Sequence, residues 1–130
     1  MIQRLDEVRD VFVFCCYTGF AYSDVYGLTP DHLVKGIDGK KWIYTYRQKT
    51  KIKSNVPLLT QAKRIVEKYE NHPFCVNKGR LLPVNSNQKM NAYLKEIADV
   101  CGINKKLTTH IARHTFATTV CLSNKIPLEV

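Results

Sequence analysis

The stretch that decides how this chain is interpreted is Leu107–Thr119, which reads LTTHIARHTFATT. Thr108 or Thr109 is a suitable N-cap, and neither glycine nor proline interrupts the residues that follow, so the sequence predicts a helix that begins there. Helical spacing groups three apolar residues on one side of this helix: Ala112, Phe116 and Val120. The helix is therefore expected to pack into the core along that side.

A second face of the same helix carries His110, Arg113, His114 and Ala117, at the i, i+3, i+4, i+7 spacing. Free N–H groups and the positive end of the helix dipole attract anions at a helix start. The Arg113 guanidinium can grip a phosphate with two hydrogen bonds, and His110 lies where the dipole favours the neutral ring. A solvated helix end explains either histidine alone, but the combination indicates a phosphate site.

The composition also favours a polyanionic partner. The 130 residues carry 20 Lys and Arg against 11 Asp and Glu, which gives a net charge of +9, a large excess for a chain of this length. The length suits one domain with a real core. Nucleic acid is the leading candidate partner. A membrane surface ranks second because no basic amphipathic helix stands out, and neither a membrane nor a small-molecule substrate is expected.

The five cysteines do not form a recognisable framework. They are Cys15, Cys16, Cys75, Cys101 and Cys121. Their odd number, the adjacent pair and the lack of a CxxC motif argue against disulfides and against a zinc site, so no metal is expected. Cys15 and Cys16 lie in an apolar run and are expected to be buried thiols, which fits a reducing cytoplasm. Early acidic residues argue against a signal peptide, and no segment is long enough to span a bilayer.

The first half of the chain predicts helices followed by a small sheet. Leu5–Tyr17 reads as a buried helix that Gly19 ends, and Ala21–Gly27 as a short helical turn. The apolar stripe of the long helix is expected at Val8, Val11, Phe12, Cys15 and Cys16. Three antiparallel strands are expected at Leu33–Gly36, Lys41–Arg47 and Ile52–Leu58. Asp38-Gly39 is a strong hairpin turn, whereas Gln48–Lys51 reads as an exposed basic loop.

Strand Lys41–Arg47 alternates as a half-buried strand should: Trp42, Tyr44 and Tyr46 point one way, and Ile43, Thr45 and Arg47 the other.

The second half predicts three helices. Thr60–Asn71 reads as a surface helix that Thr60 caps and His72-Pro73 stops, and Arg80–Val84 as a short extended piece. Another helix is expected to begin at Ser86 or Asn87, to bury Met90, Tyr93, Leu94, Ile97 and Ala98, and to end at Gly102. A basic connector then leads into the helix of Leu107–Thr119. The fold class is therefore α+β, mainly helical, with a small three-stranded antiparallel sheet.

Three motifs occur in a telling order. They are Thr18-Gly19 with Asp24 after a buried helix, a hairpin-loop lysine (Lys49) followed by Asn55-Val56-Pro57-Leu58, and HxxRHTFAT at residues 110–118. This order resembles the catalytic domain of tyrosine recombinases, the phage-integrase and Xer family, in the variant of Bacteroides-type mobile elements. The resemblance covers almost all of residues 1–130. It implies a DNA integrase that cuts and rejoins strands through a 3′-phosphotyrosine link, with no metal and no nucleotide cofactor.

The resemblance implies a role for each motif residue. Arg113 would clamp the phosphate oxygens that gain charge during attack, and His110 would hydrogen-bond the phosphate or relay a proton. Lys49 would protonate the departing 5′ oxygen. Asp24 would support the site from behind, and His114 is expected to orient or pack rather than react.

The sequence departs from the family pattern after the Thr18-Gly19 turn. The family has an arginine where this chain has Ala21, and alanine cannot hold a phosphate. Arg9, on the preceding helix, is the candidate to replace it. The alternative is that Arg9 is an exposed helix charge.

The family nucleophile is a tyrosine that follows the HxxR box, and the seven tyrosines of this chain all precede it. The expectation is a partial catalytic domain that lacks both the nucleophile segment and the family's N-terminal core-binding domain, and that does not cleave DNA alone. The parent protein would act as a tetramer on DNA in the bacterial cytoplasm, associated with the nucleoid.

The candidate DNA contacts are basic residues near these motifs: Arg47, Lys49, Lys51, Lys53, Lys105, Lys106 and Arg113. Two alternatives stay open. The chain can be a non-catalytic DNA-binding or regulatory protein that kept the fold, which Ala21 and the missing tyrosine support. It can also be a basic RNA-binding module, although Tyr44 and Tyr46 lack the glycine-rich pattern of RNA-stacking sheets.

Overall fold

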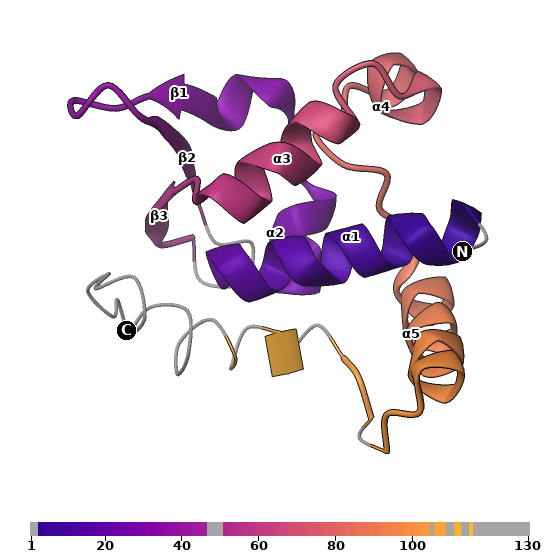
Figure 1. Ribbon diagram of the computed structural model, residues 1–130. Coiled ribbons are helices and arrows are strands. Elements are labelled where there is room, and N and C mark those ends of the chain that lie inside the picture. The colour runs from indigo at the N-terminus through magenta and orange to yellow at the C-terminus, as the bar shows by residue number, and fades with distance from the viewer. Residues whose placement is uncertain (1–2, 47–50, 105, 109–110, 113–114, 116–130) are drawn as a thin grey trace.

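The computed structural model of the chain describes residues 3–46, 51–104, 106–108, 111–112 and 115. In chain order its elements are α1 (Gln3–Thr18), α2 (Tyr22–Tyr26), the 3-10 helix η1 (Pro30–His32), β1 (Leu33–Lys35), β2 (Lys41–Tyr46), β3 (Lys53–Pro57), α3 (Thr60–Lys68), α4 (Pro73–Lys78) and α5 (Asn87–Cys101). Figure 1 shows a mainly helical body with the sheet to one side. This confirms the expected α+β class and the three-stranded antiparallel sheet.

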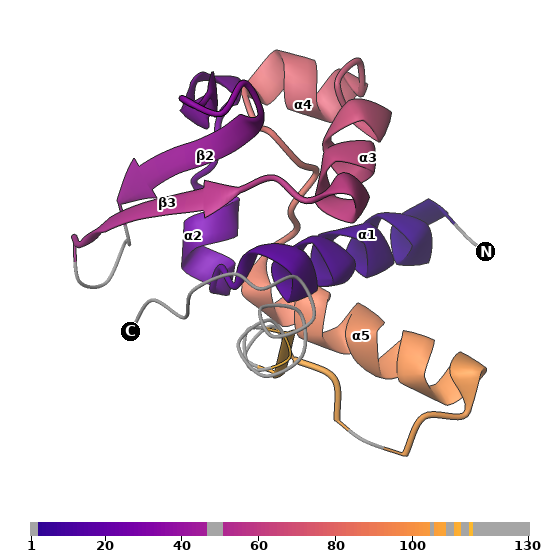
Figure 2. The same ribbon diagram turned by 60° about the vertical axis from the view of Figure 1, so that its left-hand side comes forward.

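Helix α1 is the centre of the core. It packs against both α3 and α5, and Figures 1 and 2 show it passing between them. Val8, Val11, Phe14 and Cys15 are each at most 1% exposed. The sequence pattern placed Phe12 and Cys16 inward, but both are only partly buried against the core. Phe14, which the pattern did not place inward, is buried instead. The buried face of α1 is wider than a single row of i, i+3, i+4 positions because neighbouring helices cover α1 on two sides.

The sheet has the order β1-β2-β3, and both pairs are antiparallel. Leu33 pairs with Ile43, and Ile43 with Val56, so these residues lie side by side across the three strands. Ile43 and Val56 are buried, whereas Tyr44 and Tyr46 are exposed. The alternation predicted for β2 is therefore confirmed, and its aromatic face is the outer one.

Two local expectations after the sheet were wrong. Thr60 does not cap α3: Leu59 occupies the N-cap without a side-chain hydrogen bond, and Thr60 is the first helical residue. The helix predicted to reach Asn71 ends at Lys68, with Tyr69 as its C-cap, and His72-Pro73 begins another helix, α4. The His72 ring accepts a hydrogen bond from Phe74 N–H, and proline is tolerated in the first turn because it needs no N–H partner there.

The segment after α4 is irregular rather than extended. Leu81, Leu82 and Val84 are buried, but no strand forms within residues 80–84. Leu81 N–H donates to the Leu28 carbonyl oxygen at 3.0 Å, which ties the segment to the end of the α2 region. Residues 80–84 are therefore held in place by the burial of their apolar side chains rather than by pairing with a strand.

The two helix ends predicted for α5 are confirmed. The Ser86 side chain accepts a hydrogen bond from Lys89 N–H at 3.3 Å, and Gly102 ends the helix in the left-handed region with φ +70°. Such a conformation suits glycine because a Cβ would be strained there. Met90, Leu94, Ile97 and Ala98 are buried, as predicted, and Tyr93 packs partly buried against the core.

A polar cluster joins α1 to α3. Asp10 is 7% exposed and accepts hydrogen bonds from Lys68 Nζ at 2.7 Å and from the Tyr69 hydroxyl at 2.5 Å. Lys68 also donates to Asp6, and this bond lowers the pKa of Asp6, while the bond to Asp10 raises the pKa of Lys68. Asp6 therefore stabilises the fold above its unfolded pKa of about 3.9, and that contribution is lost as the pH falls through its lower folded value.

We expect Asp10→Ala to lower the free energy of unfolding by roughly 2 kcal/mol, because it leaves the Tyr69 hydroxyl and Lys68 without their buried acceptor. Urea denaturation at neutral pH measures this difference. Glu67→Ala, at an exposed position of α3, is the control and should stay within about 0.5 kcal/mol of the wild type. Equal stability of the two variants would show that the cluster does not hold α1 on α3.

Candidate functional site

The Thr18-Gly19 turn sets the geometry at the end of α1. Gly19 has φ +76°, a left-handed conformation that turns the chain out of the helix. Gly19 N–H donates to the Cys15 carbonyl oxygen at 2.9 Å, and the Thr18 hydroxyl donates to the Phe14 carbonyl oxygen at 2.8 Å. Phe20 follows directly and is fully buried. The turn is thus anchored on both sides, and it fixes where α2 begins.

Asp24 lies in the first turn of α2 and is 5% exposed. Its Oδ2 accepts a hydrogen bond from Ala21 N–H at 3.3 Å, which satisfies one of the free donors at the helix start. A carboxylate at this buried position holds the backbone of the turn. This geometry is compatible with the supporting role predicted for Asp24.

Helix α2 is also fastened from outside the motif. The Tyr22 hydroxyl donates to the Asn85 carbonyl oxygen at 2.6 Å, and the Arg80 guanidinium donates to the Tyr26 carbonyl oxygen at 2.7 Å. Neither contact was predicted from the sequence. No pattern could have found the Tyr22 contact, because its acceptor is a backbone carbonyl 63 residues away.

The helix predicted to begin at Thr108 is confirmed within the described residues. The Thr108 side chain accepts a hydrogen bond from Ile111 N–H at 3.2 Å, and Ala112 N–H donates to the Thr108 carbonyl oxygen at 3.1 Å. Ala112 is fully buried in the same core cluster as Phe20 and Val25. The start of this helix and the turn after α1 therefore share one core. The rest of the predicted apolar face, Phe116 and Val120, lies outside the described residues.

Most of the predicted phosphate ligands and DNA contacts lie outside the described residues: Arg47, Lys49, Lys105, His110, Arg113 and His114. Their convergence stays a prediction.

The described candidate DNA contacts are Lys51, Lys53 and Lys106, and all three are exposed. Lys53 pairs with Tyr46 at the end of the β2–β3 ladder, so it marks the end of the hairpin whose loop carries Lys49. Lys51 has φ +59°. The structure thus supplies the hairpin that the prediction requires, with basic residues at its loop end.

Arg9 is engaged with carboxylates on its own helix. Its guanidinium donates to Asp6 and lies 3.4 Å from Asp10 Oδ1. Its side chain is 43% exposed. These contacts give Arg9 a place in the cluster between α1 and α3, and its action in place of the arginine missing at Ala21 stays a prediction.

Within the described ranges, no helix has the length and apolar character needed to cross a membrane, and no three His, Cys, Asp or Glu side chains gather where a metal ion could bind. Two adjacent thiols lie near the end of α1. Burial raises the pKa of Cys15 well above its usual value and that of Cys16 to about 11.

Comparison with solved structures finds a similar fold. The chain superposes on the XerH site-specific recombinase, solved bound to its difH substrate as a pre-cleavage complex, with a TM-score of 0.63 and 17% sequence identity. The match covers 96% of this chain and 38% of that chain. No family model matches the sequence, and no curated protein matches it. At this identity the likeness shows a shared fold over nearly all of residues 1–130.

We expect Asp24→Ala to lower the free energy of unfolding by at least about 1 kcal/mol, because the cap on Ala21 N–H is lost at a buried position. Asp24→Asn keeps an acceptor oxygen and should lose less. Asp31→Ala, an exposed position of η1, is the control. Thermal unfolding of the three variants would contradict this account if Asp24→Ala melted with the Asp31→Ala control.

Proposed function

We propose that residues 1–130 are part of the catalytic domain of a tyrosine-type site-specific recombinase, a DNA integrase of the kind found in Bacteroides mobile elements. The observation that carries the proposal is the fold shared with a DNA-bound recombinase over 96% of the chain. It is supported by the HxxRHTFAT sequence at residues 110–118, of which the described Ala112 is buried in the same hydrophobic core as Phe20. Neither the fold nor the box alone would suffice.

The proposed chemistry uses positive and hydrogen-bonding groups around one backbone phosphate. A phosphodiester under attack gathers negative charge on its non-bridging oxygens, and preplaced cations lower that barrier. Arg113 would clamp these oxygens, His110 would donate a hydrogen bond or relay a proton, and Lys49 would protonate the departing 5′ oxygen. His114 would orient or pack beside Arg113.

Asp24 would act through the backbone it holds. Its hydrogen bond with Ala21 N–H fixes the turn that leads into α2. Arg9 would supply the missing cation by exchanging its contacts with Asp6 and Asp10 for the phosphate.

The proposed substrate is duplex DNA, bound mainly through phosphates. Lys51, Lys53 and Lys106 are exposed and available for such contacts, with Arg47 and Lys105 as further candidates. Lysine contacts of this kind are independent of sequence and sensitive to salt. The parent enzyme would assemble as a tetramer on DNA in the bacterial cytoplasm.

None of the seven tyrosines follows the HxxR box. Two of them are also engaged elsewhere: the Tyr69 hydroxyl donates to Asp10, and the Tyr22 hydroxyl donates to the Asn85 carbonyl oxygen. The nucleophile of the proposed reaction is therefore not among residues 1–130, and we propose that these residues alone bind DNA without cleaving it. Ala21 favours a second candidate, a non-catalytic DNA-binding protein that kept the fold.

We expect the chain to bind a duplex oligonucleotide in fluorescence anisotropy, with an affinity that falls steeply as salt rises. Arg113→Ala should weaken binding by roughly tenfold or more, because it removes charge-assisted hydrogen bonds to phosphate. Arg4→Ala is the matched control: Arg4 lies in the first turn of α1, far along the helix from Gly19, and binds Glu96.

The same samples on a denaturing gel should show no covalent protein–DNA adduct. The proposal would be overturned if the wild-type chain did not bind duplex DNA, or if it bound single-stranded RNA with equal affinity. An effect of Arg113→Ala no larger than that of Arg4→Ala would favour the non-catalytic alternative.

A further inference from the structure

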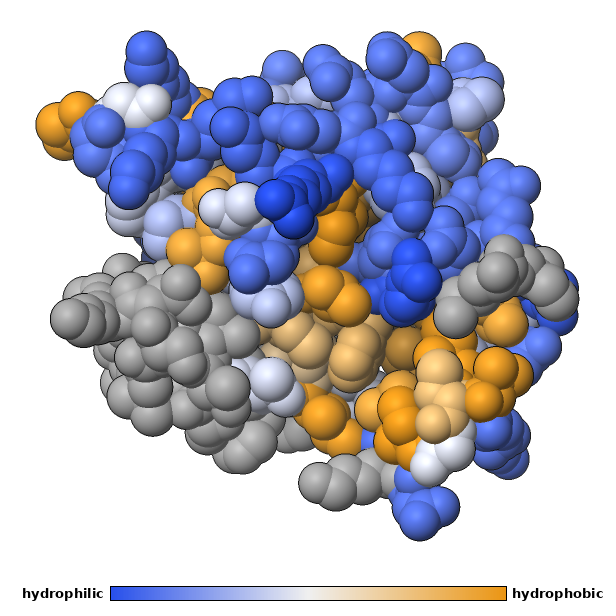
Figure 3. All heavy atoms as spheres, in the orientation of Figure 1, coloured by the Kyte–Doolittle hydropathy of each residue, from blue (hydrophilic) through white to orange (hydrophobic). Residues whose placement is uncertain are grey.

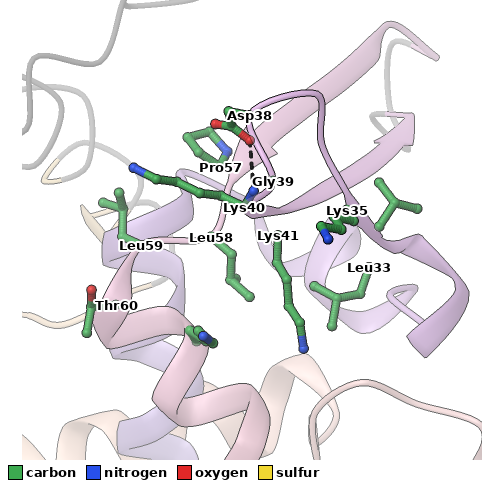
Figure 4. Close-up of a pocket in the computed structure, with 12 residues that line it drawn as sticks. Leu33, Lys35, Asp38, Gly39, Lys40, Lys41, Pro57, Leu58, Leu59 and Thr60 are labelled. Carbon is green, nitrogen blue, oxygen red and sulfur yellow. Dashed lines mark hydrogen bonds between the residues drawn. The ribbon is translucent and has the colours of Figure 1, made fainter.

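A second basic feature lies at the opposite end of the sheet from the Lys49 loop. It is an open cavity of about 810 Å³ between the β1–β2 turn and the first turn of α3 (Figure 4). Four lysines line it: Lys35, Lys40, Lys41 and Lys63. We call this feature the four-lysine groove. In Figure 3 the face over the β1–β2 turn and α3 is largely hydrophilic.

The groove carries a clear excess of positive charge. None of its four ammonium groups forms an ion pair with another described residue. Among the described residues that line it, Asp38 is the one acidic residue. Its Oδ1 accepts hydrogen bonds from Lys40 N–H at 3.0 Å and from Trp42 Nε1–H at 3.1 Å, so this carboxylate is used within the turn.

Two of these lysines oppose each other directly. Lys35 pairs with Lys41 across β1 and β2. Side chains at such positions have Cβ atoms about 5 Å apart, and like charges there destabilise a sheet. An anion between them would remove this repulsion. The arrangement is therefore costly in the free chain and favourable with a bound polyanion.

The walls of the groove are firmly placed. Leu33 and Leu58 pack partly buried against the core, and Leu58 N–H donates to the Lys41 carbonyl oxygen at 3.0 Å, which joins β3 to the start of β2. Figure 4 shows the Lys41 side chain extending into the space between the hairpin and α3. The lysine stems thus start from a rigid frame, while their ammonium groups stay in solvent.

The groove lies at the other end of β2 from the Tyr46–Lys53 pair, where the basic β2–β3 hairpin end begins. Lys41 is the first residue of β2, and the Tyr46–Lys53 pair is at its other end, so the two basic regions are about 17 Å apart along the strand. Ammonium groups on flexible stems suit repeated phosphates because they act as point charges without a fixed fork. A duplex carries one such charge every ~3.4 Å along each strand.

We propose that the four-lysine groove binds the phosphate backbone of duplex DNA, independently of DNA sequence, as a second contact besides the phosphate site proposed around Arg113. The inference rests on the proposed function, which makes DNA the polyanion. The groove holds the duplex by charge alone, so its contribution is the same for every DNA sequence and weakens with salt.

The test compares two triple variants with the same net charge. Lys35→Gln/Lys41→Gln/Lys63→Gln neutralises the groove, and Lys78→Gln/Lys89→Gln/Lys95→Gln neutralises three exposed lysines of α4 and α5. Fluorescence anisotropy with a duplex of arbitrary sequence gives the affinity and its salt dependence. The groove variant should bind roughly tenfold more weakly and lower the slope of log K against log salt by about 2 to 3. The control should change affinity less than about threefold.

The melting temperature of the groove variant should equal or exceed that of the wild type, because the Lys35–Lys41 repulsion is gone; a lower value, with lost binding, would overturn the proposal. Equal affinities of the two triple variants would also overturn it, while the Arg113→Ala effect could still stand. If the groove variant lost binding to polyglutamate and kept its binding to DNA, the proposal would be overturned and the groove would be assigned to an acidic protein. A wild-type chain that does not bind duplex DNA would defeat the proposed function itself.

Discussion

The structure depends on the burial of α1 from two sides. Phe14 and Cys15 are fully buried, and the helix packs between α3 and α5. A helix covered in this way must find partners for any polar group it carries inward, because an unpaired buried carboxylate is costly. Asp10 is such a group, and its bonds to Lys68 and Tyr69 fix how α3 lies on α1. The apolar face of α1 and its buried, paired Asp10 thus set the positions of the neighbouring helices.

The site follows from where this helix ends. Gly19 turns the chain back into the core, Phe20 anchors it, and Asp24 holds the turn through Ala21 N–H. Ala112, from the far end of the sequence, is buried in the same cluster. Ala112 and the residues around the Thr18-Gly19 turn thus contribute to one hydrophobic core. The proposed phosphate chemistry requires, in addition, that this packing bring the side chains of the HxxR box to the turn.

Local patterns predicted the elements well, and long-range contacts account for what they missed. The alternation of β2 and the Ser86 and Thr108 caps depend on residues a few positions apart, so the sequence contains them. Phe14 was missed because burial on two sides widens the inward face beyond one helical row. α4 was missed because Pro73 can both stop and start a helix. The four-lysine groove could not be foreseen, since its charges meet only when β1, β2 and α3 come together.

The central claim is that Lys49, His110 and Arg113 surround one backbone phosphate. A crystal structure of the chain bound to a duplex oligonucleotide measures it directly. The account predicts that Lys49 Nζ and the Arg113 guanidinium both lie within about 5 Å of the same phosphorus, the span of one hydrogen bond to a phosphate oxygen. A complex in which these two groups contact phosphates on different sides of the molecule, or in which the duplex avoids both, would contradict it.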